Sequence, residues 1–297
     1  MNTQPLFSVL IANYNNGKYI KDAINSVIAQ TYSNWEIIIV DDGSSDNSRR
    51  ELSTFSTDKR IHLYYNEQNR GCGFTKRRCV ELSNGELCGF LDSDDVLLND
   101  ALAVHANIHL QKPDISCCFS RFYVCDEHLN IIDELRLLQK PDNITYFENG
   151  DYMPEHFASF KRNLYTQTPG ISPILPAAVD QDLYFKLEEV SPIYISDKFT
   201  YKYRSTPNQI SQNTKSYEAL LWNLLVRHDT ASRRRLQLNN PAITALYKKI
   251  QDLSLELDSN KCNREELIQV HQTLDGIQSS IAYRIGKTIT KPFSYLR

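Results

Sequence analysis

Short apolar runs alternate with segments of helical periodicity over the first third of the chain. The run Leu6–Tyr14 predicts a buried strand, and Trp35–Ser44 predicts a second strand that ends abruptly in acidic and turn residues. Between the two strands, Tyr19–Gln30 predicts a helix, because five apolar residues share one face of it: Ile20, Ala23, Ile24, Val27 and Ile28. A further helix is expected from Asp46 onward, with a capping side chain near Ser45.

The same alternation continues to about residue 112. Ile61–Glu67 predicts a third strand, Gly73–Gly85 a helix and Glu86–Asp95 a fourth strand, followed by a helix over Ala101–Lys112. The segment Asp114–Asp126 is typical of a strand pair or of one arm of a hairpin. Alternating strands and helices indicate an α/β fold, with a mostly parallel sheet covered by helices.

The second half of the chain is less regular. Five prolines interrupt it before a predicted helix over Asp180–Val190: Pro141, Pro154, Pro169, Pro173 and Pro176. From about Ser216 the pattern is helical to the end. Leu246, Ile250, Leu253 and Leu257 keep a heptad-like spacing, but for too few heptads to predict a coiled coil.

Composition narrows the class of protein. The 297 residues carry a net charge of -3, with 41% hydrophobic and 23% charged residues, as soluble globular proteins do. The chain as a whole lacks the excess of basic residues that is typical of nucleic-acid-binding proteins, so no nucleic-acid partner is expected. No apolar stretch is long enough to span a bilayer and no leader is visible, which favours a cytoplasmic protein. The seven cysteines show no CxxC pair, so we expect reduced, mostly buried thiols.

Two acidic clusters follow predicted strands, and ligands of open α/β sheets bind beyond the carboxyl ends of strands. Asp41 and Asp42 end the second strand, and Asp92-Ser93-Asp94-Asp95 ends the fourth. Carboxylates one residue apart can hold Mg²⁺ or Mn²⁺, whose remaining ligands are typically phosphate oxygens. The alternative for the second cluster is a helix cap, and for residues 42–45 a turn.

The order of four segments resembles glycosyltransferase family 2, which has the GT-A fold. These segments are SVLIANYNNGKYI, IIIVDDGSSDNS, NRGCGFTKRR and GFLDSDD. The resemblance covers residues 6–212 and implies a GT-A-like catalytic domain over 1–212. Within it, 1–112 would bind the nucleotide sugar and 113–212 would face the acceptor, while 213–297 would form a helical extension.

The resemblance also implies roles for individual residues. Ala12, Tyr14, Asn15, Asp41 and Asp42 would hold the base and ribose. Lys76 and Arg77 would approach the nucleotide or diphosphate, with a solvated helix face as the alternative. In the second acidic cluster, Asp94 would coordinate the metal. Asp92 would contact the ribose or support the metal through water, and Ser93 would belong to the nucleotide-sugar site. Asp95 would share one of these roles or cap the next helix.

The segment AAVDQDLYFKLEEV resembles the part of the family that carries the catalytic base, and this places Asp180 in that role. Two departures stand out. Val179 replaces the usual Glu beside the base, and Thr206 or a neighbour stands where a His often helps to hold the metal or diphosphate. Thr is a poorer ligand than imidazole, so the cation would depend on Asp94 and phosphates.

The last 22 residues, 276–297, carry basic and apolar side chains and no acidic ones. Such an end can lie on an anionic membrane surface, at the inner face of the membrane and beside a lipid-linked acceptor. The alternative is a helix packed on the catalytic domain or on another subunit of a homo-oligomer.

The resemblance as a whole implies a metal-dependent, inverting glycosyltransferase that moves a sugar from a nucleotide-diphosphate sugar to a glycan or lipid-linked acceptor. Cell-surface polysaccharide or lipopolysaccharide biosynthesis is the setting that it implies. Two alternatives stay open at this point: a sugar-phosphate nucleotidyltransferase and a non-catalytic scaffold that binds nucleotide sugars. The sequence does not indicate the nucleobase of the donor, the sugar, the acceptor or the linkage.

Overall fold

The structure is a computed structural model of the chain and describes residues 4–135, 145–148, 156–205, 216–236 and 248. Contacts within the chain divide it into two compact units, Met1–Asn213 and Thr214–Arg297. Thr206, the heptad-like series and the basic end at 276–297 lie outside the described residues.

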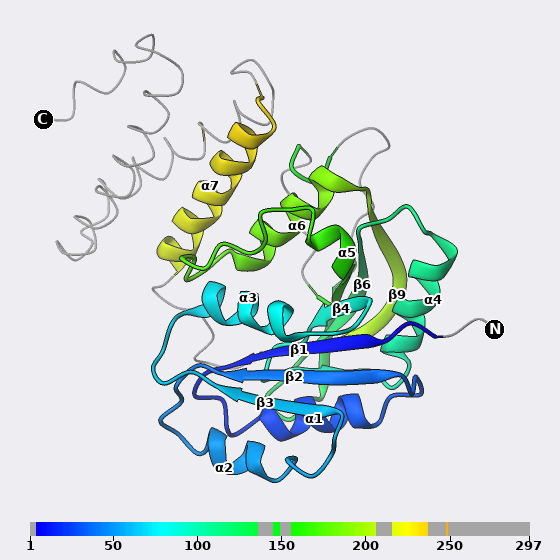
Figure 1. The fold of residues 1–297 in the computed structure, drawn as a ribbon, viewed down its shortest axis with the longest axis vertical. Coiled ribbons are helices and arrows are strands. Elements are labelled where there is room, and N and C mark those ends of the chain that lie inside the picture. Colours follow the sequence, from blue (N-terminus) through cyan, green and yellow to red (C-terminus); the bar gives the residue numbers. More distant parts are fainter. Residues whose placement is uncertain (1–3, 136–144, 149–155, 206–215, 237–247, 249–297) are drawn as a thin grey trace, which may run out of the picture. The chain divides into compact units, whose positions relative to one another are not determined.

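The first part of unit 1 is a parallel α/β layer. Figure 1 shows α3 on one face of the strands, and α1 and α2 on the other. The strands are β1 (Phe7–Asn13), β2 (Trp35–Asp41), β3 (Ile61–Tyr65) and β4 (Leu87–Phe90), and the helices are α1 (Ile20–Ile28), α2 (Ser48–Ser53) and α3 (Cys72–Leu82). β1 pairs in parallel with β2 and β4, and β2 pairs in parallel with β3, so these strands have the order β3-β2-β1-β4.

The hydrophobic pattern explains these elements. All seven residues of β2 and six of the seven in β1 are buried, as expected for strands covered on both faces. Helix α1 buries Ile20, Ala23, Ile24 and Val27, but Ile28 is 40% exposed. Four of the five apolar residues on the predicted face are therefore buried, and the fifth, at the end of the helix, is exposed.

The predicted start of α2 was also wrong. The helix begins at Ser48 rather than at Asp46, and its N-cap residue, Asn47, makes no side-chain capping bond. Asp46 instead accepts a hydrogen bond from the Ser48 amide (2.9 Å) and one from the Gly17 amide (2.8 Å). The Asp46 side chain therefore ties the turn before α2 to the turn before α1.

The second part of unit 1 extends the same sheet with antiparallel and parallel strands. In the described residues the sheet has nine strands in the order β3-β2-β1-β4-β8-β6-β9-β5, with β7 paired to β6 outside this path. The added elements are β5 (Val96–Leu97), α4 (Ala101–Gln111), β6 (Cys117–Cys125), β7 (Ile131–Leu135), β8 (Ala158–Lys161), α5 (Arg162–Tyr165), α6 (Val179–Val190) and β9 (Ile193–Arg204). The predicted α/β class, with a mixed, mostly parallel sheet and flanking helices, is confirmed.

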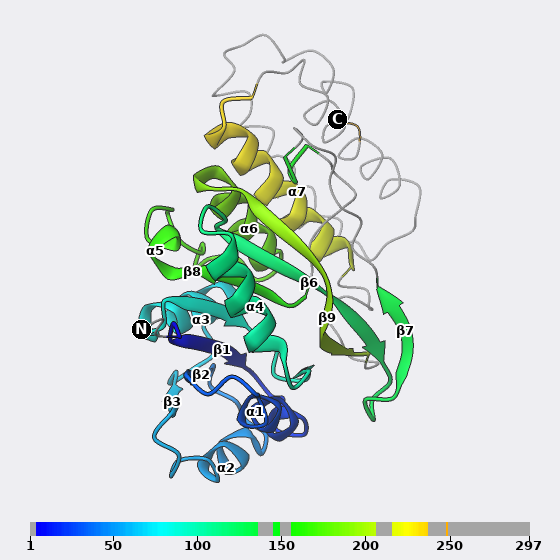
Figure 2. The same cartoon turned by 90° about the vertical axis from the view of Figure 1, so that its right-hand side faces the viewer.

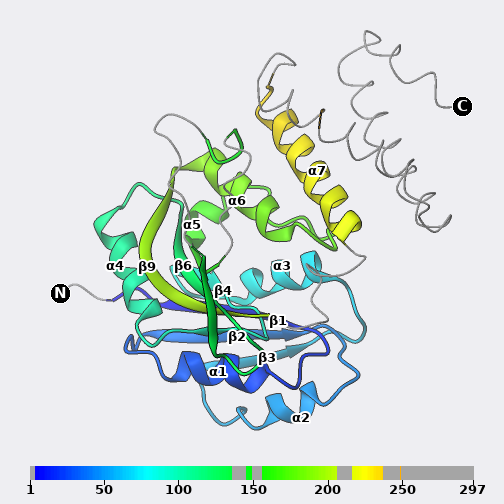
Figure 3. The ribbon, with the colours of Figure 1, turned by 180° about the vertical axis from the view of Figure 1, so that it is seen from behind.

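Two long strands, β6 and β9, curve across this part of the molecule (Figure 3). Figure 2 shows β7 beside β6, and their antiparallel pairing confirms that Asp114–Asp126 contains one arm of a hairpin. Strands β8 and β9 were not predicted. β8 pairs antiparallel with both β4 and β6, so it joins the parallel layer to the second part of the sheet.

The interior is formed mainly by β1, β2, α1 and α4, with aromatic side chains from β6, from β9 and from the residue before β8. The six cysteines within the described residues are free thiols, and five of them are buried, which confirms the expectation drawn from their spacing. In unit 2, α7 (Ser216–Arg233) is the helix that the structure describes. Among the described residues, no helix has both the length and the apolar character needed to cross a membrane.

Candidate functional site

The carboxyl ends of three parallel strands lie side by side at one edge of the sheet. Asn13 at the end of β1 is paired in register with Asp41 at the end of β2. β4 pairs with the other side of β1 and ends at Phe90, two residues before Asp92. The two acidic clusters, about 50 residues apart in the sequence, therefore meet at this edge.

Asp41 is fully buried and its oxygens are occupied by the protein's own donors. Oδ2 accepts a hydrogen bond from Asn13 Nδ2 (2.8 Å), and Oδ1 accepts one from the Ser44 amide (3.0 Å). The Arg49 guanidinium lies 3.9 Å from Oδ1 and stacks over the ring of Tyr65. In this structure Asp41 shapes the turn after β2, and its predicted contact with a ligand stays a prediction.

Asp42 is buried in the same way, and it holds the loop between β3 and α3. Its Oδ1 accepts bonds from Asn66 Nδ2 (2.6 Å) and the Arg70 amide (2.9 Å), and its Oδ2 accepts one from the Gly71 amide (2.9 Å). Gly71 has φ +90°, a conformation that suits glycine. The carboxylate therefore organises the approach to α3.

The turn after β1 presents its side chains outward. Tyr14 is 49% exposed and Asn15 is exposed, whereas Ala12 is half-buried. Asn15 Oδ1 accepts a bond from the Ser45 amide (2.8 Å), and the Asn15 amide donates to Ser44 Oγ (2.9 Å). These hydrogen bonds hold the turns after β1 and β2 together. The exposed ring of Tyr14 is available to stack on a flat ligand group.

Within the second acidic cluster, Asp92 and Asp94 are half-buried and Ser93 and Asp95 are buried. Asp95 accepts hydrogen bonds from the hydroxyl of Tyr201 (2.7 Å) and the amide of Arg204 (2.6 Å), both on β9. Burial, together with the charges of Asp94 and Asp92, raises the pKa of Asp95 well above its ordinary value. Asp95 therefore anchors the cluster to β9. It does not cap the next helix, whose N-cap residue is Asp100.

His156 was missed by the sequence analysis. One oxygen each of Asp92 and Asp95 and one ring nitrogen of His156 lie within 4.8 Å of one another. The imidazole stacks on Tyr201 with a ring separation of 5.1 Å, and its Nδ1 lies 4.0 Å from Asp92 Oδ2. Two carboxylates and an imidazole form a ligand set that suits Mn²⁺ or Mg²⁺. Because His156 lies 64 positions beyond Asp92, no local spacing could have pointed to it.

The residues present therefore fit a divalent cation at this edge. The predicted ligand Asp94 is not a member of the three-residue group, although it lies between two members of it. Its backbone carbonyl accepts a hydrogen bond of 2.6 Å from Arg204 Nε. Its half-buried carboxylate is the predicted metal ligand, a role that stays a prediction.

Lys76 joins the second acidic cluster to the predicted base. Its buried Nζ lies 2.7 Å from Asp180 Oδ1 and 3.3 Å from Asp92 Oδ1, over the ring of Phe90. Burial lowers the pKa of Lys76, but the two carboxylates outweigh this effect and raise it well above its ordinary value. The structure thus brings Lys76, Asp92 and Asp180 together from α3, the turn after β4 and the first turn of α6.

Arg77 contacts a different part of the protein. Its guanidinium donates to Glu81 Oε1 (2.8 Å) and to the carbonyl of Ile171 (3.1 Å). The same loop is held from α6, because Asp182 accepts a hydrogen bond from the Ser172 amide (2.9 Å). Arg77 and Asp182 therefore fix the loop that leads into α6 and its Asp180. Val179, which stands where the family usually has Glu, is buried.

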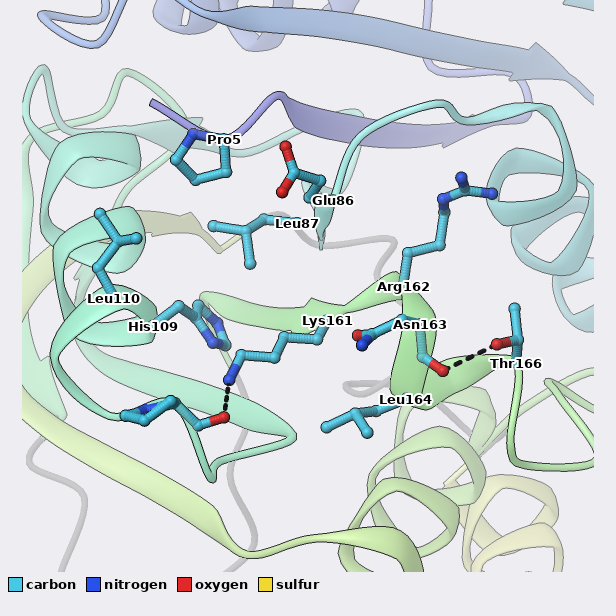
Figure 4. Close-up of a pocket in the computed structure, with 11 residues that line it drawn as sticks. Pro5, Glu86, Leu87, His109, Leu110, Lys161, Arg162, Asn163, Leu164 and Thr166 are labelled. Atoms are coloured by element: carbon cyan, nitrogen blue, oxygen red, sulfur yellow. Dashed lines mark hydrogen bonds between the residues drawn. The ribbon is translucent and has the colours of Figure 1, made fainter. Parts of the chain in front are cut away.

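A hollow lies at the opposite edge of the sheet, near the amino ends of β1 and β4. It has a volume of about 680 Å³, and Figure 4 shows Leu87, His109 and Lys161 lining it. Lys161 Nζ donates to the carbonyl of Pro113. None of the site residues predicted from the sequence is among its lining residues, so the acidic edge is the candidate functional site.

Comparison with known proteins shows the family of the chain. Residues 8–168 match the model of the family described as glycosyl transferase family 2. The Escherichia coli UDP-Glc:alpha-D-GlcNAc-diphosphoundecaprenol beta-1,3-glucosyltransferase WfgD is 33% identical over 141 residues, which are 48% of this chain and 53% of WfgD. The chain spans about half the length, or less, of the first curated relatives that it matches.

Solved structures show the same fold. S. aureus TarS 1-349 in complex with UDP-GlcNAc has a TM-score of 0.68 at 18% identity, covering 94% of this chain and 82% of that one. The mannosyltransferase PcManGT from Pyrobaculum calidifontis, in complex with GDP-Man and Mn²⁺, has a TM-score of 0.56 at 13% identity, covering 98% of this chain and 82% of the other. These similarities confirm the expected GT-A-type architecture.

Proposed function

Because the chain belongs to glycosyltransferase family 2, we propose that it transfers a sugar from a nucleotide-diphosphate sugar to an acceptor hydroxyl, with inversion at the anomeric carbon. The observation that carries this proposal is the position of Asp180. Its carboxylate faces the acidic cluster at the strand ends, linked to Asp92 through the ammonium of Lys76. The proposed general base and an acidic cluster that can hold a cation thus lie at the same edge of the sheet.

The donor would lie along the carboxyl ends of β1, β2 and β4. Tyr14 supplies an exposed ring for the base, while Asp41 and Asp42 hold the surrounding turns. The similar proteins support a nucleotide-sugar donor, since they include complexes with UDP-GlcNAc and GDP-Man and an enzyme named for UDP-Glc. These donors carry more than one nucleobase, so the nucleobase that this chain binds must be identified by experiment.

A divalent cation, Mn²⁺ or Mg²⁺, would be held by carboxylates of Asp92, Asp94 and Asp95 together with His156. When bound, such an ion offsets the negative charge that develops on the departing diphosphate. The imidazole would supply the nitrogen ligand that Thr206 cannot. The Mn²⁺ in the PcManGT complex supports this part of the proposal.

Asp180 would act as the general base. Lys76 occupies its Oδ1, and no hydrogen bond within the described residues is made by Oδ2 on this 37% exposed side chain. Oδ2 takes the proton of the acceptor hydroxyl as the hydroxyl oxygen bonds to the anomeric carbon. The bond from that carbon to the diphosphate oxygen breaks on the opposite face, and its electron pair leaves with the nucleoside diphosphate.

The acceptor is proposed to be a growing surface glycan or a lipid-linked sugar. WfgD, whose name gives a diphosphoundecaprenol-linked acceptor, supports this class. We also propose a role in bacterial polysaccharide or lipopolysaccharide assembly, and similarity to a chondroitin synthase of Escherichia coli supports the polysaccharide part. Contact of residues 276–297 with a membrane stays part of this proposal.

The function is tested by binding and by turnover. A thermal-shift panel with UDP-GlcNAc, UDP-Glc, GDP-Man and dTDP-Glc, with and without Mn²⁺, should give a metal-dependent rise in Tm for the true donor, because ligands that bind only the folded state stabilise it. The same donor should release nucleoside diphosphate slowly in the presence of Mn²⁺. Release argues against a non-catalytic scaffold.

The matched variants are Asp94→Ala and Asp100→Ala, the second at an exposed acidic residue six positions away. Asp94→Ala should abolish the metal-dependent part of the shift, and Asp100→Ala should keep it. An unchanged shift in Asp94→Ala removes that carboxylate from the site. If the wild-type protein responds to no donor and releases no diphosphate, the proposed function is wrong.

A further inference from the structure

Lys76 lies in a run of three successive cations, Lys76-Arg77-Arg78, but it alone among them is buried. The buried residues of α3 recur with helical spacing, at Gly73, Thr75, Lys76, Cys79 and Val80. Lys76 therefore lies on the face of α3 that packs against β1 and β2, and its side chain is 7% exposed. A lysine is rarely so buried unless its charge is paired.

The ammonium of Lys76 contacts two carboxylates of the protein itself. Asp180 Oδ1 lies 2.7 Å from Nζ and Asp92 Oδ1 lies 3.3 Å from it, so two carboxylates from different elements share one cation. Asp92 turns its other oxygen toward His156, with Oδ2 4.0 Å from Nδ1. Two carboxylates thus face the three N–H donors of the ammonium, which leaves at most one donor for any further acceptor.

We infer that Lys76 is a positioning residue, which holds the carboxylate of Asp180 at a set distance from the donor site and directs its Oδ2 toward the acceptor, rather than a ligand of the donor phosphates. This inference deepens the proposed function and depends on it. The physical reason is geometric: with Oδ1 fixed by a buried cation, the second oxygen has one orientation, and a base works only when it is within hydrogen-bond reach of the proton it takes. The same cation also separates two carboxylates that would otherwise repel each other.

The two roles predict opposite kinetic results. Loss of a donor ligand would weaken donor binding, whereas loss of a positioning residue would lower turnover at saturating donor. We therefore expect Lys76→Met to lower kcat for donor hydrolysis by about 100-fold, within the usual range for general-base catalysis. The Kd for UDP with Mn²⁺ should change by less than about threefold. Lys59→Met, at an exposed lysine without a role in the site, should leave both quantities unchanged.

A double-mutant cycle separates positioning of Asp180 from a general structural effect. In the Asp180→Asn background, Lys76→Met should lower kcat by less than about threefold further, because residues that act as one unit are not additive. A full, multiplicative loss in that background would show that Lys76 acts independently of Asp180 and would overturn the inference.

Lys76→Met leaves two carboxylates without their cation, so the variant can fail to fold. Lys76→Arg keeps the charge, and we expect it to retain UDP affinity and to lose about tenfold in kcat through the altered geometry. If either Lys76 variant weakens UDP binding by more than tenfold while kcat at saturation is kept, Lys76 is a donor ligand and the inference is wrong. A wild-type protein that hydrolyses no donor refutes the proposed function, and with it this role. A loss of UDP affinity in an active enzyme refutes the role of Lys76 alone.

Discussion

Tyr201 on β9 donates a hydrogen bond of 2.7 Å from its hydroxyl to Oδ2 of Asp95, which follows β4 in the sequence. The two residues are 106 positions apart, and both are buried. The Tyr201 hydroxyl also accepts a bond of 3.3 Å from the Asp92 amide. One tyrosine thus holds the acidic cluster at two points, and His156 stacks on its ring.

Tyr201→Phe should destabilise the protein by about 2 kcal/mol, because a buried carboxylate loses a hydrogen-bond donor while the ring packing is kept. The measurement is the free energy of unfolding from urea titration. The control is Tyr123→Phe, whose ring stacks on Phe199 with centroids 4.4 Å apart. It should stay within about 0.5 kcal/mol of wild type. Equal stability of Tyr201→Phe and wild type would contradict this account of Asp95.

Asp42→Asn should lower the free energy of unfolding by more than the loss of a surface carboxylate does. The Asn amide would turn a donor toward the amides of Arg70 or Gly71, and charge-assisted bonds to them would be lost. We expect a loss of about 3 kcal/mol in the free energy of unfolding. Asp58→Asn, which removes a surface pair with Arg60, should cost less than about 1 kcal/mol. A smaller cost for Asp42→Asn than for Asp58→Asn would refute the structural role of Asp42.

Gly73→Ala should disturb the loop that leads to Asp180. A Cβ at Gly73 would lie 2.4 Å from the carbonyl oxygen of Ser172 and 2.7 Å from that of Leu175. Both are backbone atoms, so the loop must shift, at a cost of about 1–3 kcal/mol. Differential scanning calorimetry should show a lower Tm, and Gly73→Ser should lower it further. Wild-type Tm in both variants would mean that the loop is not packed as the structure has it.

Stability should fall as the pH is lowered from 7 to 5, because two buried histidines resist protonation. Burial lowers the pKa of His105 from 6.5 to about 3 and that of His109 to about 4. Unfolded histidines bind protons below about 6.5, so the unfolded state binds more protons over this range and is favoured as the pH falls. Each histidine contributes about 2 kcal/mol of this loss between pH 7 and pH 5.

The histidine origin of that loss can be checked with single variants. His109→Gln should flatten the dependence of the free energy of unfolding on pH, because Gln does not titrate. His128→Gln, at an exposed residue of the β6–β7 turn, should keep the wild-type slope. If the two variants have the same slope, His109 is not responsible.

His156→Gln should weaken binding of Mn²⁺ in the presence of UDP by about tenfold, equivalent to about 1.4 kcal/mol. Isothermal titration calorimetry or the EPR signal of free Mn²⁺ measures this affinity without any turnover. His62→Gln, on β3 near Glu36, is the matched control and should bind Mn²⁺ as the wild type does. Unchanged affinity in His156→Gln would exclude the imidazole as a ligand.

The local sequence was sufficient for the first half of the fold and for the convergence of the two acidic clusters at one edge of the sheet. β1 and β2 are continuous apolar runs because helices cover both of their faces, and such runs are visible in a single sequence. Adjacent parallel strands place their carboxyl ends at one edge, so the meeting of the turns after β2 and β4 followed from the order of the elements alone.

Only the tertiary structure decided which side chains complete that edge. His156 reaches Asp92 because β8 pairs antiparallel with β4, a pairing between segments about 70 residues apart that no local pattern encodes. The spacing of the buried residues in α3 could have distinguished Lys76 from Arg77. The partner of Lys76, Asp180, comes from α6, and its position depends on tertiary packing. Strand periodicity and turn residues act over a few neighbours, whereas the pairing of distant charges depends on how the whole sheet closes. This is why the sequence could indicate the edge that carries the candidate site, while its contacts were decided by the fold.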